Sequence, residues 1–330
     1  MEIKEYRNPV NVLHFDAIRA FLTSSNCMFT QLHEAISKGL LNEVIIDNSS
    51  NSFKTPSVNL ETKVMQLHES HLSYLWTVCY FLTSVREITF ERATSNGIIH
   101  LNDSPKFDTL ICLLEWGRSL KTHHCSWPID MPDPTHPTDT ASNANLLYIY
   151  ALQYLMYHEV GHFVLHYDAI DFIKATKNPF YELTKQDVDL LYNMETEADN
   201  YAFDCMSLCD EEDNIKFLKH SGAVVAHLSN FYLLSEPDIR GYTHPDLDRR
   251  LRCITEKIEI QSKELSWGIN HLYATGIQLF FCINHIEILP KDLEQHSYED
   301  WNEIGSDLYN ILDLLKKDYQ IFKPYKEYLL

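Results

Sequence analysis

The sequence predicts a mostly α-helical protein of the α+β class, whose β-structure is limited to a small sheet or hairpin. The chain of 330 residues has only 9 glycines, whereas Leu, Glu and Lys, which favour helices, are frequent. Hydrophobic residues make up 45% of the chain and charged residues 22%, which is the balance of an ordinary globular protein. Long apolar runs with helical spacing fill most of the chain, and the extended segments are few and short.

The first part of the chain is expected to combine helices with one strand. Helices are predicted around 15–22 and 29–40, before a short strand at Glu43–Asp47. Residues 59–84 are predicted to form a long helix rich in aromatic and apolar residues.

A β-hairpin is predicted at 87–103. The segments ITFERAT and GIIHL flank an Asn96-Gly97 pair, and Asn-Gly is a strong signal for a two-residue hairpin turn. Residues 106–122 then predict a helix. The next segment, 123–140, holds four prolines and is expected to be a loop that borders a functional cleft.

Two long helices are predicted after this loop. The first begins near Ser142 or Asn143, since either side chain is a suitable N-cap, and runs to about residue 167. The second covers about 184–209, with Thr184 as the N-cap and Asp187 in the acidic first turn.

The chain is interpreted as three regions. These are a mixed N-terminal region at 1–140, a catalytic core at 141–260 and a helical C-terminal region at 261–330, with one compact domain as the alternative. Inside the core, a further helix over about 212–234 precedes a loop around 241–245.

The net charge and the cysteine content limit the binding partners and the cellular locations that are expected. The net charge of −20 argues against unspecific binding to nucleic acid, whose phosphates would be repelled. The eight cysteines include no CxxC pair, and the N-terminal MEIKEYRNPV lacks the apolar core of a signal peptide. These observations predict reduced thiols and a cytoplasmic location.

The segment 267–286 contains no Asp, Glu, Lys or Arg, as a membrane span would. It contains Asn270, His271 and Gln278, which would be costly inside a bilayer, so a buried or amphipathic helix is expected instead. No membrane span is therefore expected, and the sequence does not indicate an oligomeric state.

The most specific motif is HEVGH at 158–162, inside the helix predicted at about 143–167. His158 and His162 are four residues apart, so they share one helix face and can bind the same zinc ion. Glu159 is predicted to act as the general base on a metal-bound water. The alternative is a buried helix with two hydrogen-bonded histidines, which is costly without a partner.

Zinc needs a third protein ligand, and three candidates follow the motif. His166 would lie about 12 Å from His158 along the helix, too far to share the ion easily. Asp168 is expected to be a solvated acid at the helix end. Glu195, 33 residues after His162 in the sequence ETEAD, is the preferred ligand.

The ETEAD segment also offers an outer partner for a ligand histidine. Asp199 shares a helix face with Glu195 and can orient the histidine ring through its outer nitrogen. Ala198 lets the two helices pack closely, and Glu197 is expected to face elsewhere. The alternative is an acidic, solvated helix face.

A third motif, THPDLDRRL, begins at Thr243. His244, alone or with Tyr242, is a candidate to stabilise the oxyanion of the reaction. Arg250 is a candidate to hold a carboxylate of the site or a substrate carbonyl. The alternative, of equal weight, is a capped helix start with a surface histidine and an ion-paired arginine.

The ordered motifs HEVGH, ExxAD and THPxxxxRL resemble those of gluzincin zinc metallopeptidases, above all the HtpX- and Oma-type enzymes. The stretch HEVGHFVLH…ETEADNYAF is also similar to the soluble ImmA/IrrE-type peptidases, and the chain resembles Lit-type phage-exclusion peptidases. The resemblance covers about 150–252. It implies a zincin-like core in which His158, His162 and Glu195 are the metal ligands. Glu159 would be the general base, and Asp199 would lie behind the ligands. His244 and Arg250 fall at the family's His and Arg positions.

The expected function is that of a zinc-dependent endopeptidase with one zinc ion and a restricted protein or peptide substrate. The substrate is expected to bind as an extended strand, for which the 87–103 hairpin is a candidate edge. The resemblance implies a role in phage defence or stress regulation. The alternatives are a zinc-binding regulatory or scaffold protein with a latent or inactive site, and a zinc hydrolase that acts on other bonds.

Overall fold

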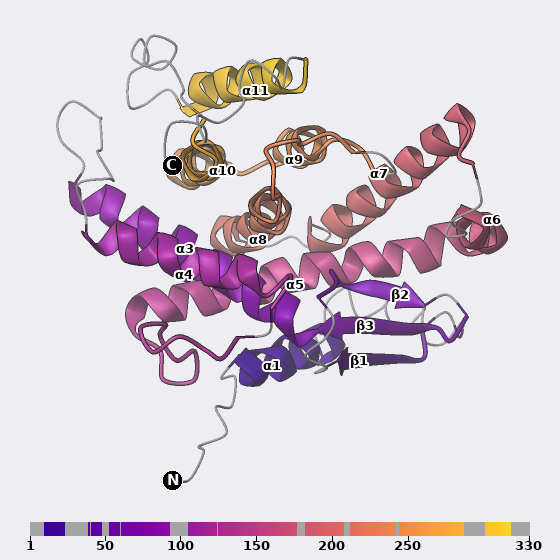
Figure 1. The fold of residues 1–330 in the computed structure, drawn as a ribbon, viewed down its shortest axis with the longest axis horizontal. Helices are drawn as coiled ribbons and strands as arrows, with labels where there is room; N and C mark the ends of the chain where they lie inside the picture. The colour runs from indigo at the N-terminus through magenta and orange to yellow at the C-terminus, as the bar shows by residue number, and fades with distance from the viewer. Residues whose placement is uncertain are drawn as a thin grey trace, which may run out of the picture.

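The fold is described from a computed structural model of the chain. The structure describes residues 10–23, 39, 41–47, 53–59, 61–92, 105–123, 125–176, 182–207, 212–241, 244–286 and 301–317. Most of these residues are helical and three short strands form a single sheet, so the predicted α+β class with a small sheet is confirmed (Figure 1).

The sheet has the strand order β1-β3-β2. Strand β1 (Glu43–Asp47) pairs in parallel with β3 (Val64–His68), and β2 (Ser57–Asn59) pairs antiparallel with β3. The strand predicted at Glu43–Asp47 is therefore confirmed. Strand β2 is an edge strand of this sheet, because it pairs with β3 on one side only in the described part of the chain.

Two predictions near the sheet are wrong. Helix α3 covers Glu69–Arg92, so the first residues of the predicted helix over 59–84 belong to β2 and β3 instead. The same helix extends through 87–92, where a hairpin was predicted. Burial explains the second difference, because Ile88 is 1% exposed and packs in the core as part of the helix. The remainder of the predicted hairpin, including Asn96-Gly97, lies outside the described residues.

The other helices follow the prediction more closely. Helix α1 spans Val10–Thr23, α4 spans Pro105–Ser119, and α5 spans Asp139–His166. A short 3-10 turn, η2 (Tyr167–Ala169), and α6 (Ile170–Thr176) follow α5. The predicted helix over 29–40 falls almost wholly outside the described residues.

The second half of the chain is helical. It comprises α7 (Lys185–Ser207), α8 (Asp213–Tyr232), α9 (Leu247–Thr255), α10 (Lys263–Ile283) and α11 (Trp301–Lys317). The segment considered as a membrane span forms most of α10. No helix in the described part of the chain has the length and apolar character that crossing a membrane requires.

Helix caps locate the start of the two central helices. Thr138, rather than Ser142 or Asn143, is the N-cap of α5, and its side chain accepts a hydrogen bond from the Ala141 amide. At α7 the predicted cap is present, since the Asp187 amide donates to the Thr184 hydroxyl and the Thr184 amide donates to the Asp187 carboxylate.

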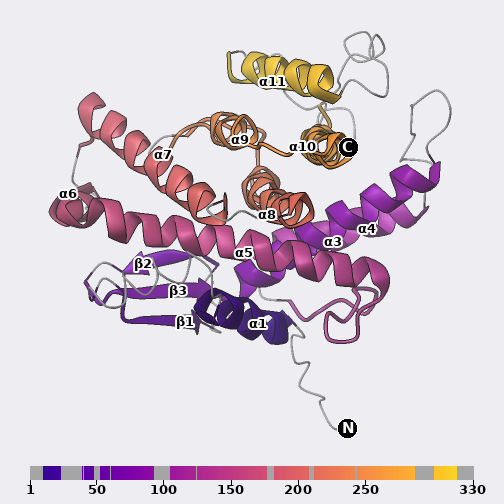
Figure 2. The same cartoon turned by 180° about the vertical axis from the view of Figure 1, so that it is seen from behind.

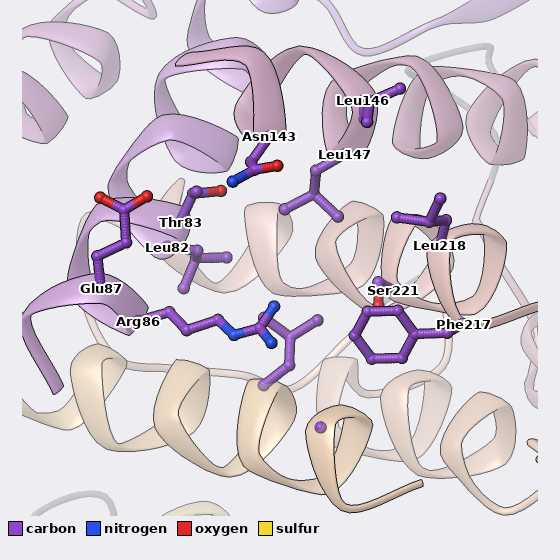
Figure 3. Close-up of a pocket in the computed structure, with 12 residues that line it drawn as sticks. Leu82, Thr83, Arg86, Glu87, Asn143, Leu146, Leu147, Phe217, Leu218 and Ser221 are labelled. Atoms are coloured by element: carbon purple, nitrogen blue, oxygen red, sulfur yellow. The ribbon is translucent and has the colours of Figure 1, made fainter. Parts of the chain in front are cut away.

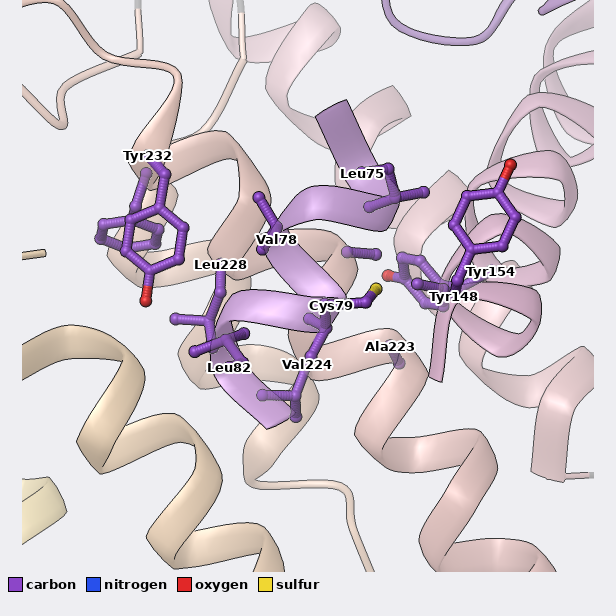
Figure 4. Packing of buried hydrophobic residues seen from close by; sticks show 14 of the residues in the cluster. Leu75, Val78, Cys79, Leu82, Tyr148, Tyr154, Ala223, Val224, Leu228 and Tyr232 are labelled. Atoms are coloured by element: carbon purple, nitrogen blue, oxygen red, sulfur yellow. The ribbon is translucent and has the colours of Figure 1, made fainter. Parts of the chain in front are cut away.

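Helix α5 forms the centre of the molecule. The sheet and α1 lie on one side of it and α7, α8 and α9 on the other, as both views show (Figures 1 and 2). Apolar side chains surround α5, as expected for a helix enclosed by others. Figure 4 shows part of this core, where α3, α5 and α8 contribute Cys79, Tyr148 and Leu228 among others.

Buried apolar side chains from all three predicted regions belong to one core cluster, from Val10 to Leu315. The same cluster includes residues of the sheet, of α5 and of α11. The division at 140 and 260 stays a prediction, since no boundary has been tested.

Candidate metal centre and active site

Three side chains form a group that could hold a metal ion. His158 and His162 come from α5 and Glu195 from α7, and their ligand atoms all lie within 4.8 Å of one another. The Nε2 atoms of the two histidines are 3.2 Å apart. Glu195 Oε2 lies 3.4 Å from His158 Nε2, and Glu195 Oε1 lies 3.4 Å from His162 Nε2.

These distances suit a small tetrahedral ion. Zinc bonds to nitrogen and oxygen ligands are about 2.0–2.1 Å long, which places neighbouring ligand atoms of a tetrahedron about 3.3 Å apart. The two imidazole Nε2 atoms are separated by nearly this distance, and each lies 3.4 Å from a different oxygen of the Glu195 carboxylate. The donor set of two histidines and one carboxylate is also a set that catalytic zinc uses, with a fourth position left open.

Close packing of α5 on α7 brings Glu195 to the histidines. A Cβ atom at Gly161 would lie 3.2 Å from Ala198 Cα and 3.2 Å from the Tyr201 ring, so the two helices touch through small residues. Gly161 lies inside HEVGH and Ala198 inside ETEAD. The two motifs therefore supply both the ligands and the contact that holds them together.

Asp199, predicted to orient a ligand histidine, lies behind the ligand group. It is 4% exposed, and its Oδ1 is 2.9 Å from His158 Nδ1, the nitrogen that faces away from Glu195. Arg250 from α9 donates from Nε and Nη2 to the two Asp199 oxygens at 2.7 and 2.8 Å. Burial opposes the charge on Asp199, but Arg250 and the neighbouring histidines hold its carboxyl pKa well below the usual value.

Arg250 also approaches Glu195, with Nη2 3.6 Å from Oε2. Burial disfavours the charged guanidinium, yet the carboxylates of Asp199 and Glu195 raise the pKa of Arg250. For Glu195, the bonds to both histidines outweigh burial and hold the carboxyl pKa well below its usual value. Both carboxylates are thus kept ionised, which is the form that binds a metal or a ligand histidine.

A buried pair extends the network beyond what the sequence suggested. The Tyr154 hydroxyl is 2.8 Å from His227 Nε2 on α8 and 3.3 Å from Asp199 Oδ1. Burial lowers the pKa of His227 to about 4, so this ring is neutral at neutral pH. Neither residue belongs to a sequence motif, because the contact between them depends on how α5 and α8 pack.

His166 has a place in the site that differs from the one considered for it. Its Nδ1 is 3.2 Å from His162 Nδ1, and its Nε2 is 2.8 Å from Glu197 Oε2. It therefore contacts the outer nitrogen of a candidate ligand and is not part of the ligand group. Glu197 faces away from that group, as expected, but its contact with His166 was not foreseen. Asp168 is exposed and lies outside the group.

Glu159 lies in a cavity of about 480 Å³ beside the candidate ligands. Burial raises the pKa of its carboxyl, which moves the group toward the neutral range where it can both accept and release a proton. The walls come from several elements and include Pro56 and Val58 near β2, Leu155 of α5, Ile173 of α6, and Leu191 and Met194 of α7.

His244 also lines this cavity, with Nε2 3.4 Å from Glu195 Oε1. Its side chain is 55% exposed, whereas those of Arg250 and Glu195 are 13% and 14% exposed. The structure thus brings His244 and Arg250 together at Glu195, and the roles expected for them from the THPxxxxR motif stay predictions. Tyr242, the expected helper of His244, lies outside the described residues.

Comparison with known proteins identifies the family of this chain. The family model of Peptidase U49 matches residues 65–270, more than half of the chain. The chain belongs to the Peptidase U49 family. All seven of the predicted site residues lie in the matched range, while β1, β2 and α11 lie outside it. No curated protein and no solved structure matches this chain.

Membership of Peptidase U49 identifies the protein as a peptidase, a hydrolase whose substrate is a protein or peptide. The group of His158, His162 and Glu195 adds a possible metal site to this activity. These two findings are the basis of the proposal that follows.

Proposed function

We propose that this protein is a zinc-dependent endopeptidase, with His158, His162 and Glu195 as the metal ligands and Glu159 as the general base. The observation that carries the proposal is the group of two imidazole Nε2 atoms, 3.2 Å apart and each 3.4 Å from one oxygen of the Glu195 carboxylate, with Glu159 in the same cavity. Bound zinc would supply Lewis-acid chemistry, polarising the scissile carbonyl and acidifying the attacking water.

Glu159 performs the proton transfers. Its carboxylate accepts a proton from the attacking water and then passes this proton to the nitrogen of the leaving amine. Burial raises the pKa of this carboxyl, which makes it a stronger base than an exposed glutamate and so supports the first of these transfers.

Asp199 and Arg250 keep the ligands in place. Asp199 holds the outer nitrogen of His158, so that the inner Nε2 lone pair faces the ligand group. Arg250 neutralises the buried Asp199 and limits the negative charge near Glu195. His244, exposed at the edge of the cavity, is proposed to donate a hydrogen bond to the oxyanion that forms during attack.

The edge strand β2 replaces the hairpin as the proposed docking site for an extended substrate. Residues 55–58 line the active-site cavity, and β2 pairs only with β3 in the described part of the sheet. A peptide that adds to this edge forms main-chain hydrogen bonds and is placed next to Glu159. Restricted cleavage of one cellular protein, in phage defence or stress regulation, is the role we propose from the resemblance to known peptidases.

Glu159→Gln tests the proposal, and Glu43→Gln, at an exposed position of β1, is the matched control. Glu159→Gln should retain zinc, measured as metal per chain, and lose about 10²–10⁴-fold in peptidase activity, because the amide cannot take the proton. New protein termini in cells expressing the wild type, absent with Glu159→Gln, would identify the substrate. Full activity in Glu159→Gln would contradict the mechanism.

The scaffold alternative makes a different prediction in the same experiment. A zinc-binding regulatory protein with an inactive site would produce the same termini in wild type and Glu159→Gln cells. The loss of zinc in Glu195→Ala tests the ligand assignment separately, and stoichiometric zinc in that variant would place the third ligand elsewhere.

A further inference from the structure

The backbone that carries His244 is folded tightly just before α9. The His244 side chain lies at the edge of the active-site cavity and is largely exposed, so its backbone has a strong influence on where the ring lies. Gly241 and His244 touch through their backbones, since a Cβ atom at Gly241 would lie 1.8 Å from the His244 carbonyl oxygen. A shift of Gly241 would therefore be passed on to His244.

Asp246 connects Gly241 to the C-terminal helix. It is the N-cap residue of α9, a position where an aspartate side chain commonly accepts a hydrogen bond from the helix, but here it makes no such bond. Its Oδ1 instead accepts a hydrogen bond of 3.0 Å from the Gly241 amide. Its Oδ2 lies 3.4 Å from Nζ of Lys316, in the last turn of α11. The two oxygens of this carboxylate thus link Gly241 to α11.

Lys316 also neutralises a buried carboxylate in the first turn of α9. Its Nζ is 2.6 Å from Asp248 Oδ2, and Asp248 is 6% exposed. Burial raises the pKa of Asp248, the bond to Lys316 lowers it, and the nearby Asp246 raises it further. Lys316 therefore holds together two carboxylates that would otherwise repel each other where α9 begins.

A second contact docks α11 on α9. The ring centre of Tyr309 is 4.9 Å from the Arg252 guanidinium, and its hydroxyl is 3.2 Å from Thr255 Oγ1. Figure 1 shows α11 next to α10 and α9. Since α11 lies outside the range 65–270 that matches the family model, part of the chain beyond this range reaches the backbone next to the active site.

Helix α7 holds Gly241 through a different atom. The Tyr192 hydroxyl donates a hydrogen bond of 2.6 Å to the Gly241 carbonyl. Tyr192 is three residues before Glu195, about one helical turn, so this bond ties Gly241 to the helix that supplies the third candidate ligand. Gly241 is thus held at its amide by Asp246 and at its carbonyl by Tyr192.

We propose that Tyr192 and Lys316 are positioning residues that hold His244 where its ring can donate to the oxyanion of the peptidase reaction. Tyr192 fixes Gly241 directly, and Lys316 fixes it through Asp246. The inference rests on the proposed function, because it concerns the oxyanion donor of that mechanism. An oxyanion is stabilised only by a donor within hydrogen-bond distance, so a small displacement of His244 removes most of its effect.

Cleavage in a native lysate of the host cells, prepared without the expressed protein, tests the proposal. The purified, zinc-loaded full chain is added, and the rate at which new protein termini appear is compared among variants. His244→Ala should lower this rate about 100-fold. Tyr192→Phe and Lys316→Met should each lower it about tenfold, while the zinc content per chain stays that of the wild type.

Double variants show whether both residues act through His244. In the His244→Ala protein, adding Tyr192→Phe or Lys316→Met should cause no further loss, because no imidazole remains to be positioned. Lys316→Arg keeps the charge and should retain most of the wild-type rate. A general folding defect would behave differently, since it would lower the rate in the His244→Ala protein as well.

Three control variants change groups of the same kind elsewhere. Tyr232→Phe removes a hydroxyl that also donates to a glycine carbonyl, that of Gly276, at 2.8 Å. Ser221→Ala removes a buried hydroxyl at a second cavity of about 440 Å³ between α3, α5, α8 and α10, none of whose lining residues lines the active-site cavity (Figure 3). Lys317→Met removes the neighbouring, exposed charge of α11. All three should cleave at the wild-type rate.

The possible results separate this inference from the proposed function. A wild-type rate in Tyr192→Phe, Lys316→Met or His244→Ala would overturn the inference, and so would further losses in the double variants. The peptidase mechanism would survive these results as long as Glu159→Gln is inactive. If the wild type produces no new termini in the lysate, the proposed function fails and this inference fails with it.

Discussion

The orientation of His162 depends on a chain of two further side chains. When His162 offers Nε2 to a metal, its Nδ1 carries the proton and donates to His166 Nδ1. His166 must then carry its own proton on Nε2, which donates to Glu197. Burial lowers the pKa of His166, which keeps this ring neutral and able to accept at one nitrogen and donate at the other.

Removing His166 should therefore weaken metal binding without removing a ligand. We expect His166→Ala to reduce zinc affinity about 10–100-fold, measured by competition with a chelator. His166→Asn, whose side-chain oxygen can accept from His162, should recover part of the loss. His136→Ala changes a histidine whose side chain is 86% exposed and should have no effect. Unchanged affinity in His166→Ala would show that His162 does not need this partner.

The sequence predicted the site residues that repeat along one helix face. His158 and His162, and likewise Glu195 and Asp199, are four residues apart, and this spacing alone places each pair on one side of a helix. Tyr154, His227 and Glu197 were not assigned roles, because their contacts arise only when α5, α7 and α8 are packed together. A search for buried polar residues near the motif would have marked Tyr154 but not its partner.

At the level of elements, the sequence indicated most helices and strand β1, but not strands β2 and β3. Val64, Met65 and Leu67 fit either a short strand or the start of a helix, because short apolar runs do not distinguish the two. The parallel pairing of β1 with β3 brings together residues 21 positions apart and selects the strand. Residues 87–92 also fit either a strand or a helix, and here the chain is helical, with Ile88 buried in the core.

Helices α5 and α8 cross closely at Gly222, so this glycine should not tolerate a larger side chain. A Cβ atom at Gly222 of α8 would lie 2.5–2.7 Å from Tyr150 Cβ and C and from Ala151 N of α5, which is too close without a shift of the helices. Gly222→Ala should therefore lower the free energy of unfolding by about 1–3 kcal/mol despite the better helix propensity of alanine.

Urea denaturation of the purified protein measures this change. Gly117→Ala is the control, because a Cβ atom there would meet only side-chain atoms of Thr77 and Tyr74 at 3.2–3.4 Å, and such contacts can adjust. If Gly222→Ala is as stable as the wild type, α5 and α8 do not cross as closely as described.

The whole molecule buries several neutral histidines away from the candidate active site. Burial lowers the pKa of His14 and of His71 to about 3, and that of His271 to about 4. Both ring nitrogens of His14 lack a hydrogen-bond partner among the described residues, so nothing there favours the charged ring. The unfolded chain exposes these rings, and their pKa then returns to about 6.5.

Stability should consequently fall in acid. The folded-state pKa of each ring lies below the unfolded value, so the unfolded chain binds more protons as the pH falls from about 6.5 toward 4. Each histidine should then remove about 2 kcal/mol from the free energy of unfolding between pH 7 and pH 5. His14→Phe should reduce the difference between urea denaturation at these two pH values by about this amount, whereas His136→Phe at the surface should not. An equal pH dependence in His14→Phe and the wild type would mean that His14 becomes protonated without unfolding, and that its burial is incomplete.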